Sequence, residues 1–253
     1  MYGRNRGRGF GSGIPGATPM VQRIIVANAV IWLLQVVFAR TGIPLTELGA
    51  ISVHGFFHGL RIWQPLTYMW LHEVSSPWHV ALNMLFLWMI APPLEMVWGS
   101  ERFLRFYLRC GIGAGFVILG WNALASTWDP EMAYVPTLGA SGAIYGIATA
   151  FSLLWPDRTI LLLIPPIPIR AIWFVPTLFL LQFVMSSGAN ISYVGHLGGA
   201  LVAAFTLHSE LRRALGWRSI SYRWHRLRMR NRLRAVRRDE RDPRRDEDRP
   251  TYH

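Results

Sequence analysis

The sequence predicts an all-α membrane protein, a bundle of six transmembrane helices with the N- and C-termini in the cytoplasm. Of its 253 residues, 52% are hydrophobic and 16% are charged, whereas a typical soluble domain has about 25% charged residues. The charges are also segregated. Residues 24–208 contain seven acidic and seven basic residues, while residues 209–253 contain fifteen arginines and seven carboxylates. An apolar middle between basic ends is typical of a membrane domain with cytosolic tails.

Six segments are apolar and long enough to cross a bilayer, which takes about 20 residues, with a range of about 17–25. The third of them begins with arginines, which must lie at the membrane edge. A further apolar run, ILLLIPPIPI at 160–169, is too short and too rich in proline to span, so we expect it on the surface before the fifth helix. The six predicted spans are residues 22–39, 77–96, 103–125, 139–155, 171–187 and 191–208.

The same segregation of charge divides the chain into three regions. We expect residues 1–21 to be a flexible Gly/Arg-rich cytoplasmic tail and not a signal peptide, because the stretch shows no short apolar core that ends at a small-residue cleavage site. We expect residues 22–208 to form the membrane domain and residues 209–253 to be an Arg-rich cytoplasmic tail. Aromatic residues that would stack on bases are sparse in both tails. Attraction to anionic lipid headgroups explains the arginines more simply, so no nucleic-acid partner is expected.

The arginines between the spans predict the orientation, because short cytoplasmic connections collect positive charge. An even number of spans places both basic tails on one side of the membrane. The third connection carries Asp129 and Glu131, and the fifth carries no charge. The second and fourth connections carry Arg102, Arg105, Arg158 and Arg170. Both tails are therefore expected in the cytosol.

The first connection, residues 40–76, then lies outside, and its aromatic content predicts that it folds onto the membrane surface. Three of its residues are histidines, His54, His58 and His72, but no acidic cluster accompanies them, so no metal site is expected. The single cysteine, Cys110, excludes an intramolecular disulfide and a cysteine-based metal cluster.

Polar residues of three predicted spans fall at one depth near the outer surface. His79 and Asn83 occupy the first two turns of the second span, Ser141 begins the fourth, and His196 lies in the second turn of the sixth. All three of these spans enter the membrane from outside. Because polar side chains at membrane depth are costly, they usually face the bundle interior or a water-filled cavity. We therefore expect these four residues to share a site.

Small residues recur every fourth position on the fourth and sixth spans, which predicts that the two helices pack closely. With the first glycines of the two ridges level, Ser141 and His196 are offset by roughly 3 Å along the axis. The histidine leans toward the N-terminus of its helix and hence toward the serine. A Ser–His hydrogen bond is therefore expected. The ridges are Gly142, Gly146 and Ala150 on the fourth span, and Gly195, Gly199 and Ala203 on the sixth.

His79 and Asn83 are four residues apart and share one helix face. Two donors on one face suit an oxyanion hole, the group that holds the negative charge developing in acyl transfer. The backbone N–H of Ser141, at a helix N-terminus, can add a third donor. No carboxylate lies at this depth to orient His196, so the expected catalytic unit is a Ser–His dyad.

Each of these candidate site residues also has a purely structural interpretation. The GASG stretch that contains Ser141 is in most proteins a helix-start turn, and Ala143 stands where the G-x-S-x-G elbow requires glycine. A lone intramembrane histidine such as His196 is often an interhelical hydrogen-bond partner or a channel residue, and Asn83 can bond helices together. Tyr145 is more often core than site. The coincidence of three helices at one depth weighs against these interpretations together.

Four segments resemble, in order and spacing, the signature segments of rhomboid intramembrane serine proteases. The resemblance covers residues 22–208, essentially the whole membrane domain. It implies six helices, no cofactor and no metal, and cleavage of transmembrane protein substrates near the outer surface of the bilayer. The segments are HVALNMLFLW (79–88), LEMVWGSERFL (94–104), GASGAIYG (139–146) and GHLGGAL (195–201).

The resemblance also implies roles for individual residues. Ser141 corresponds to the nucleophile and His196 to the base, while His79, Asn83 and the backbone of Ser141 correspond to the oxyanion hole. Tyr145 matches the tyrosine that packs on the catalytic histidine. The implied supporting glycines are Gly139, Gly142, Gly146, Gly195 and Gly199. The expected location is a prokaryotic plasma or inner membrane, which the chain crosses several times.

The chain departs from the family pattern at two places. Trp63 is followed by Gln64 where many members have Trp-Arg, and Ala203 stands where glycine is frequent.

Two other functions are alternatives to the protease. A catalytically inactive relative that binds membrane clients would not need both Ser141 and His196. A transporter or channel would carry polar groups through the full depth, whereas the inner halves of these helices are apolar.

Overall fold

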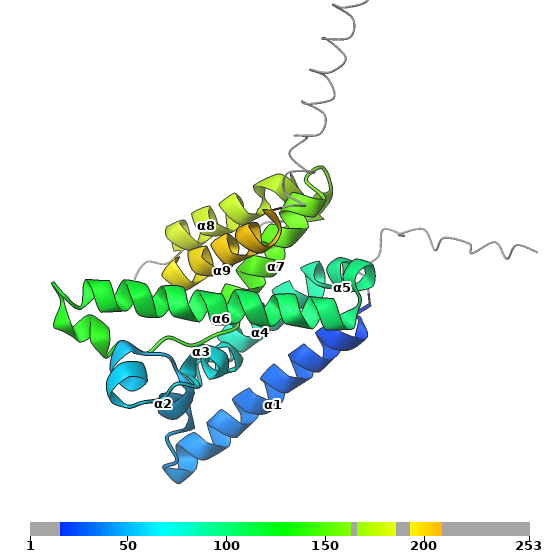
Figure 1. Cartoon of the computed structure of the whole chain (residues 1–253). Helices are drawn as coiled ribbons and strands as arrows, with labels where there is room; N and C mark the ends of the chain where they lie inside the picture. Colours follow the sequence, from blue (N-terminus) through cyan, green and yellow to red (C-terminus); the bar gives the residue numbers. More distant parts are fainter. Residues whose placement is uncertain (1–15, 163–165, 186–192, 209–253) are drawn as a thin grey trace, which may run out of the picture. The chain divides into compact units, whose positions relative to one another are not determined.

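The computed structural model describes residues 16–162, 166–185 and 193–208 (Figure 1). The described residues up to Leu207 belong to one unit. The predicted C-terminal tail and most of the predicted N-terminal tail lie outside the described residues. Also outside them are three short pieces of predicted elements: residues 163–165, 186–187 and 191–192.

Helices occur in all six predicted apolar segments. By length and composition α1 and α6 can each cross a membrane, and α4 with α5 makes a third candidate, while α7, α8 and α9 are apolar but shorter. The chain is therefore mostly helical with candidate membrane spans, and the count of six spans stays a prediction. The helices are α1 (Pro19–Thr41), α4 (Pro77–Ile90), α5 (Pro92–Trp98), α6 (Ser100–Ala125), α7 (Ser141–Leu154), α8 (Phe174–Met185) and α9 (Tyr193–Thr206).

The second predicted span, 77–96, is not one straight helix. The chain bends by 47° between α4 and α5. Pro92 and Pro93 begin α5. Proline has no backbone N–H and its ring clashes with the preceding turn, so two consecutive prolines end α4 and restart the helix in a new direction.

Helix α6 lies between two groups of elements (Figure 1). It packs against α7 and α9 on one side, and against α1 and the short helices of the first connection on the other. Large apolar side chains remain exposed on the outer faces of α1, α8 and α9, which suits contact with lipid tails rather than water. Those with more than half of their surface exposed are Val26, Leu33, Val37, Leu180, Phe183, Val184, Leu197, Leu201 and Phe205.

The first connection is folded and packs on the helices. It contains α2 (Leu45–Gly49), a π-helical turn η1 (His54–His58), α3 (Gln64–Thr67) and a 3-10 turn η2 (Tyr68–Trp70). The Tyr68 hydroxyl donates to the carbonyl oxygen of Gly111 on α6 at 2.6 Å. Gln64, at the position that departs from the family pattern, is fully buried, and its side-chain oxygen accepts from the backbone N–H of Ser52 at 3.4 Å.

The described residues, although mostly helical, also contain one short hairpin that the sequence did not predict. The surface run at 160–169 contributes to a short antiparallel hairpin of β1 (Thr159–Leu161) and β2 (Pro168–Arg170), in which Ile160 pairs with Ile169. Prolines in this run remove helical hydrogen bonds but are tolerated at the ends of short edge strands.

The two remaining turns are η3 (Pro130–Ala133), in the connection before α7, and η4 (Ala171–Trp173), which leads into α8.

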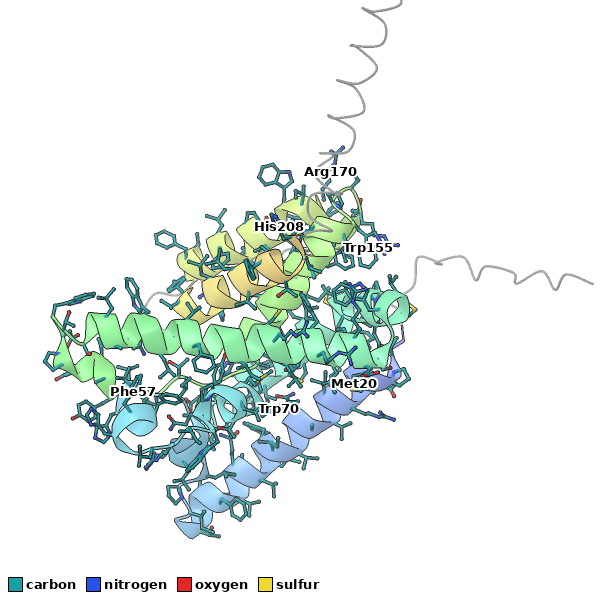
Figure 2. All side chains as sticks on the ribbon, viewed as in Figure 1. Met20, Phe57, Trp70, Trp155, Arg170 and His208 are labelled. Atoms are coloured by element: carbon teal, nitrogen blue, oxygen red, sulfur yellow. The ribbon has the colours of Figure 1, made fainter. Side chains whose placement is uncertain are left out.

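Figure 2 shows Met20, Trp155 and Arg170 toward one end of the bundle and Phe57 toward the other. Trp155 is the last residue of the fourth predicted span, and Arg170 belongs to the connection after it, which is predicted to be cytosolic. Phe57 belongs to the connection predicted to lie outside.

Candidate active site

Ser141 and His196 come together from two helices. Ser141 is the first residue of α7 and is partly buried, and His196 lies in the first turn of α9 with 8% of its surface exposed. The Nε2 atom of His196 is 2.6 Å from the Oγ atom of Ser141, a hydrogen bond of normal length. The contact expected from the depth of the two residues is present.

Close contact between α7 and α9 permits this approach. A Cβ atom added to Gly199 would overlap the carbonyl oxygen of Gly142, and one added to Gly146 would lie 3.2 Å from the carbonyl oxygen of Gly199. The backbones therefore touch along the two glycine ridges. Ala203, which replaces a frequent family glycine, is fully buried within the same packing.

The turn before Ser141 requires glycine. Gly139 has φ +126°, a conformation that other residues rarely adopt. Its N–H donates to the carbonyl oxygen of Tyr68 at 3.0 Å. A side chain there would also crowd His79, since an added Cβ would lie 3.1 Å from Nε2 of that histidine. Gly139 thus places the start of α7 directly beside His79.

Gln182 of α8 holds the far side of the histidine ring. Its side-chain oxygen Oε1 lies 2.7 Å from Nδ1 of His196. An amide oxygen only accepts hydrogen bonds, so Nδ1 carries the proton and Nε2 presents its lone pair to the hydroxyl of Ser141. This tautomer is the one that can take a proton from serine.

Tyr145 covers one face of the His196 ring. The two rings stack with centroids 4.2 Å apart and planes 11° from parallel. The Tyr145 hydroxyl donates to the same Oε1 atom of Gln182 at 3.0 Å. The histidine ring is therefore fixed in its plane by stacking and in rotation by hydrogen bonds at both nitrogens.

His79 presents a donor toward the same place. The backbone N–H of Glu73 donates to its Nδ1 atom at 3.3 Å. Nδ1 is then an acceptor, so in the neutral ring the proton is on Nε2, the atom beside Gly139. The Asn83 side chain donates from Nδ2 to the carbonyl oxygen of His79 at 2.8 Å, which leaves its second amide hydrogen for another acceptor.

Two ionisable groups of the first connection lie beside His79. His72 is fully buried and its ring packs edge-on to that of His79, with centroids 5.2 Å apart. Burial, and then the nearby His79, lower the pKa of His72 from 6.5 to about 3. The N–H and hydroxyl of Ser75 bond the Glu73 carboxylate and hold its pKa below the usual value.

The three outer histidines do not gather. His54 stacks on His58 and on Tyr134, whereas His72 lies against His79. In the part of the chain that the structure describes, no three His, Cys, Asp or Glu residues are grouped so that they could hold a metal ion. Cys110 is buried with a free thiol.

Sequence reasoning missed Gln182, although a signal was present. The fifth predicted span runs in the opposite direction to the fourth and sixth, so its outer end is its C-terminal end. Gln182 lies near that end and is the only amide side chain in Phe174–Met185. The same cost of polar groups at membrane depth that singled out His196 would have placed Gln182 beside it.

Comparison with known protein families matches a rhomboid domain to residues 59–212. The chain is 32% identical over 135 residues to Rhomboid protein 1, mitochondrial, of Saccharomyces cerevisiae, a match covering 49% of this chain and 36% of that protein. It is 25% identical over 204 residues to Rhomboid protease AarA of Providencia stuartii, covering 75% and 71%. It is 31% identical over 161 residues to Rhomboid protease GluP of Bacillus subtilis, covering 63% and 29%. The chain thus spans less than two thirds of the length of the yeast and Bacillus relatives.

Proposed function

The chain belongs to the rhomboid family, and we propose that it is an active intramembrane serine endopeptidase with Ser141 as nucleophile and His196 as general base. One observation carries the proposal, the 2.6 Å contact between Oγ of Ser141 and Nε2 of His196. A hydroxyl bonded to the unprotonated nitrogen of a held imidazole is the arrangement that nucleophilic catalysis by serine requires.

The reaction follows from this geometry in two stages. Nε2 of His196 takes the proton of Ser141 as Oγ attacks the carbonyl carbon of the scissile peptide bond. The imidazolium then gives that proton to the leaving amine as the C–N bond breaks, which leaves an acyl-enzyme. Water attacks the ester with His196 again as base, and the acid product and free Ser141 are released.

His79, Asn83 and the backbone N–H of Ser141 form the proposed oxyanion hole. The Nε2–H of His79 lies beside Gly139, next to the start of α7, and the first N–H groups of a helix have no acceptor within it. Negative charge that develops on the carbonyl oxygen is stabilised by such fixed donors. Tyr145 and the glycines Gly139, Gly142, Gly146, Gly195 and Gly199 keep these groups in place.

The substrates are transmembrane proteins, cut in or beside their membrane segment near the outer surface. Both the Ser141 end of α7 and the His196 end of α9 face that side in the orientation predicted from the arginines. Water for deacylation then enters from the outer face.

The proposal also assigns the regions of the chain. Residues 22–208 are the protease domain, with six spans in a prokaryotic plasma membrane, and residues 1–21 and 209–253 are cytoplasmic tails. Neither cofactor nor metal takes part.

The test uses the full chain purified in detergent with a fluorophosphonate probe and a fluorogenic transmembrane peptide. The wild type should be labelled and should cleave the peptide. Ser141→Ala should lose both activities, and His196→Ala should be labelled far more slowly. Labelling of Ser141→Ala at the wild-type rate would place the nucleophile elsewhere.

The same experiment addresses the second candidate, a catalytically inactive rhomboid-like protein that binds membrane clients. Such a protein would bind the transmembrane peptide without cleaving it and would react with the probe no faster than the Ser141→Ala variant.

A further inference from the structure

The Nδ1 side of His196 is the part of the site that a Ser–His dyad leaves unexplained. In serine hydrolases with a triad, a third group accepts the Nδ1–H and holds the ring in the tautomer that can act as base. Here the acceptor is the amide oxygen of Gln182, 2.7 Å away. This oxygen comes from α8, a different helix from those that carry Ser141 and His196.

The packing of α8 directs Gln182 inward. Phe179, three residues earlier on the same face, packs against Tyr145 with ring centroids 4.9 Å apart. Leu180, Phe183 and Val184, which are 61%, 75% and 69% exposed, mark the outward side of α8. Lipid-facing apolar residues on one side of α8 leave the amide on the side of the active site.

The amide oxygen is also fixed in position by a second donor. The Tyr145 hydroxyl bonds the same Oε1 atom at 3.0 Å, and the Tyr145 ring stacks on His196. Both donors therefore converge on one oxygen, which stays an acceptor for Nδ1 throughout the reaction. Tyr145 positions Gln182, and Gln182 positions the histidine.

We propose that Gln182 is the third member of the catalytic unit, a positioning residue that acts through His196. When His196 takes the proton of Ser141, the Nδ1–H donor becomes part of a cation. Hydrogen bonds from a charged donor are about twice as strong as neutral ones. The Gln182 bond thus stabilises the imidazolium more than the neutral ring and lowers the barrier, without any proton leaving Nδ1. This inference rests on the proposed function.

The test compares two variants that lack the acceptor, Gln182→Leu and Gln182→Met, with Gln182→Glu, which keeps an oxygen at the same reach in either protonation state. The matched control is Phe183→Leu, which changes the lipid-facing side of α8. For each full-length variant in detergent, the rate constant of fluorophosphonate labelling, kcat and KM for a transmembrane peptide, and Tm are measured. The labelling rate constant does not depend on the yield of folded protein, and kcat is calculated per probe-reactive molecule.

We expect Gln182→Leu and Gln182→Met to lower the labelling rate constant and kcat by about 10- to 100-fold, with KM within a few-fold of wild type. Gln182→Glu should recover both rates to within a few-fold, and Phe183→Leu should match the wild type. A wild-type labelling rate in Gln182→Leu or Gln182→Met would overturn the inference. Equal losses in the Leu and Glu variants, tracking a lower Tm, would overturn it as well by assigning Gln182 a structural role. An unlabelled wild type would instead reject the proposed function, and this inference with it.

Discussion

At the scale of single residues, Asn83 has two possible roles that its contacts help to separate. Its side chain donates to the carbonyl oxygen of His79, one turn earlier on the same helix. This bond does not join two helices, so it explains little of the stability of the bundle. The second amide hydrogen is what an oxyanion hole would use.

We predict that Asn83→Ala lowers turnover by about 10- to 10³-fold and leaves the apparent substrate affinity within a few-fold, as expected for a bond made mainly in the transition state. Turnover and Tm are to be measured on one preparation. A destabilised but fully active variant would remove Asn83 from the oxyanion hole and leave His79 and the Ser141 backbone as donors.

The buried His72 is expected to make the free energy of unfolding depend on pH. Its folded-state pKa of about 3 lies below the ordinary 6.5 because burial disfavours the charged ring. The unfolded chain therefore binds a proton that the folded chain does not, so stability falls as the pH drops from 6.5 toward 3, by at most about 1.4 kcal/mol per pH unit. Tm measured from pH 7 to pH 5 should fall less steeply in His72→Gln than in the wild type. Equal slopes would show that His72 is not the group responsible.

At the scale of elements, Glu95 of α5 caps another helix. Its carboxylate, 3% exposed, accepts from the backbone N–H groups of Met20 and Val21 at 2.8 and 2.9 Å. It also accepts from the hydroxyls of Thr18 and Ser100. These bonds satisfy the first N–H groups of α1, which have no partner within their own helix. The bend at Pro92 directs Glu95 toward the start of α1.

We expect Glu95→Ala to lower the free energy of unfolding by about 2–4 kcal/mol, because it removes a helix cap and leaves buried donors unpaired. The matched control is Glu101→Ala, which removes an exposed carboxylate that pairs with Arg105 one turn away, a contact usually worth less than about 0.5 kcal/mol. Similar Tm values for the two variants would contradict the capping role.

The contact between α7 and α9 makes a second prediction at this scale. Gly199→Leu should unfold or inactivate the protein, because the new side chain would occupy the space of the Gly142 carbonyl. Gly120→Leu on α6 is the control, since nothing lies within 4 Å of a Cβ added there. Both variants are compared by Tm and by fluorophosphonate labelling. A fully active Gly199→Leu with an unchanged Tm would mean that the two helices do not touch at this point.

At the scale of the whole molecule, the orientation predicted from the arginines can be measured directly. A Cys110→Ala background removes the one native cysteine. Single cysteines at Ser75, at Thr127 and at Asp157 then report on the first, third and fourth connections, since all three positions are exposed. A membrane-impermeant maleimide added to intact cells should label the first two variants, and should label Asp157→Cys only after the membrane is opened. The reverse pattern would invert the topology.

The sequence by itself predicted the family and the location of the helices. Apolar runs of spanning length mark α1, α4 to α5, α6, α7, α8 and α9, because a bilayer excludes unpaired backbone groups and charge. The match to a rhomboid domain confirms the family. The number of spans and their orientation remain predictions. A count of apolar residues did not predict the bend at Pro92 or the hairpin of β1 and β2. Hydropathy measures how apolar a segment is and does not show where proline interrupts a helix.

The expected meeting of Ser141 with His196 also came from sequence, because regular helices convert residue spacing into depth and face. Depth along a helix does not specify which neighbour a side chain reaches across the bundle. Only the tertiary structure placed the Gln182 oxygen on Nδ1 of His196 and the Glu95 carboxylate on the N-terminus of α1. These contacts depend on how helices rotate and bend against one another, and that is decided by packing among residues distant in the chain.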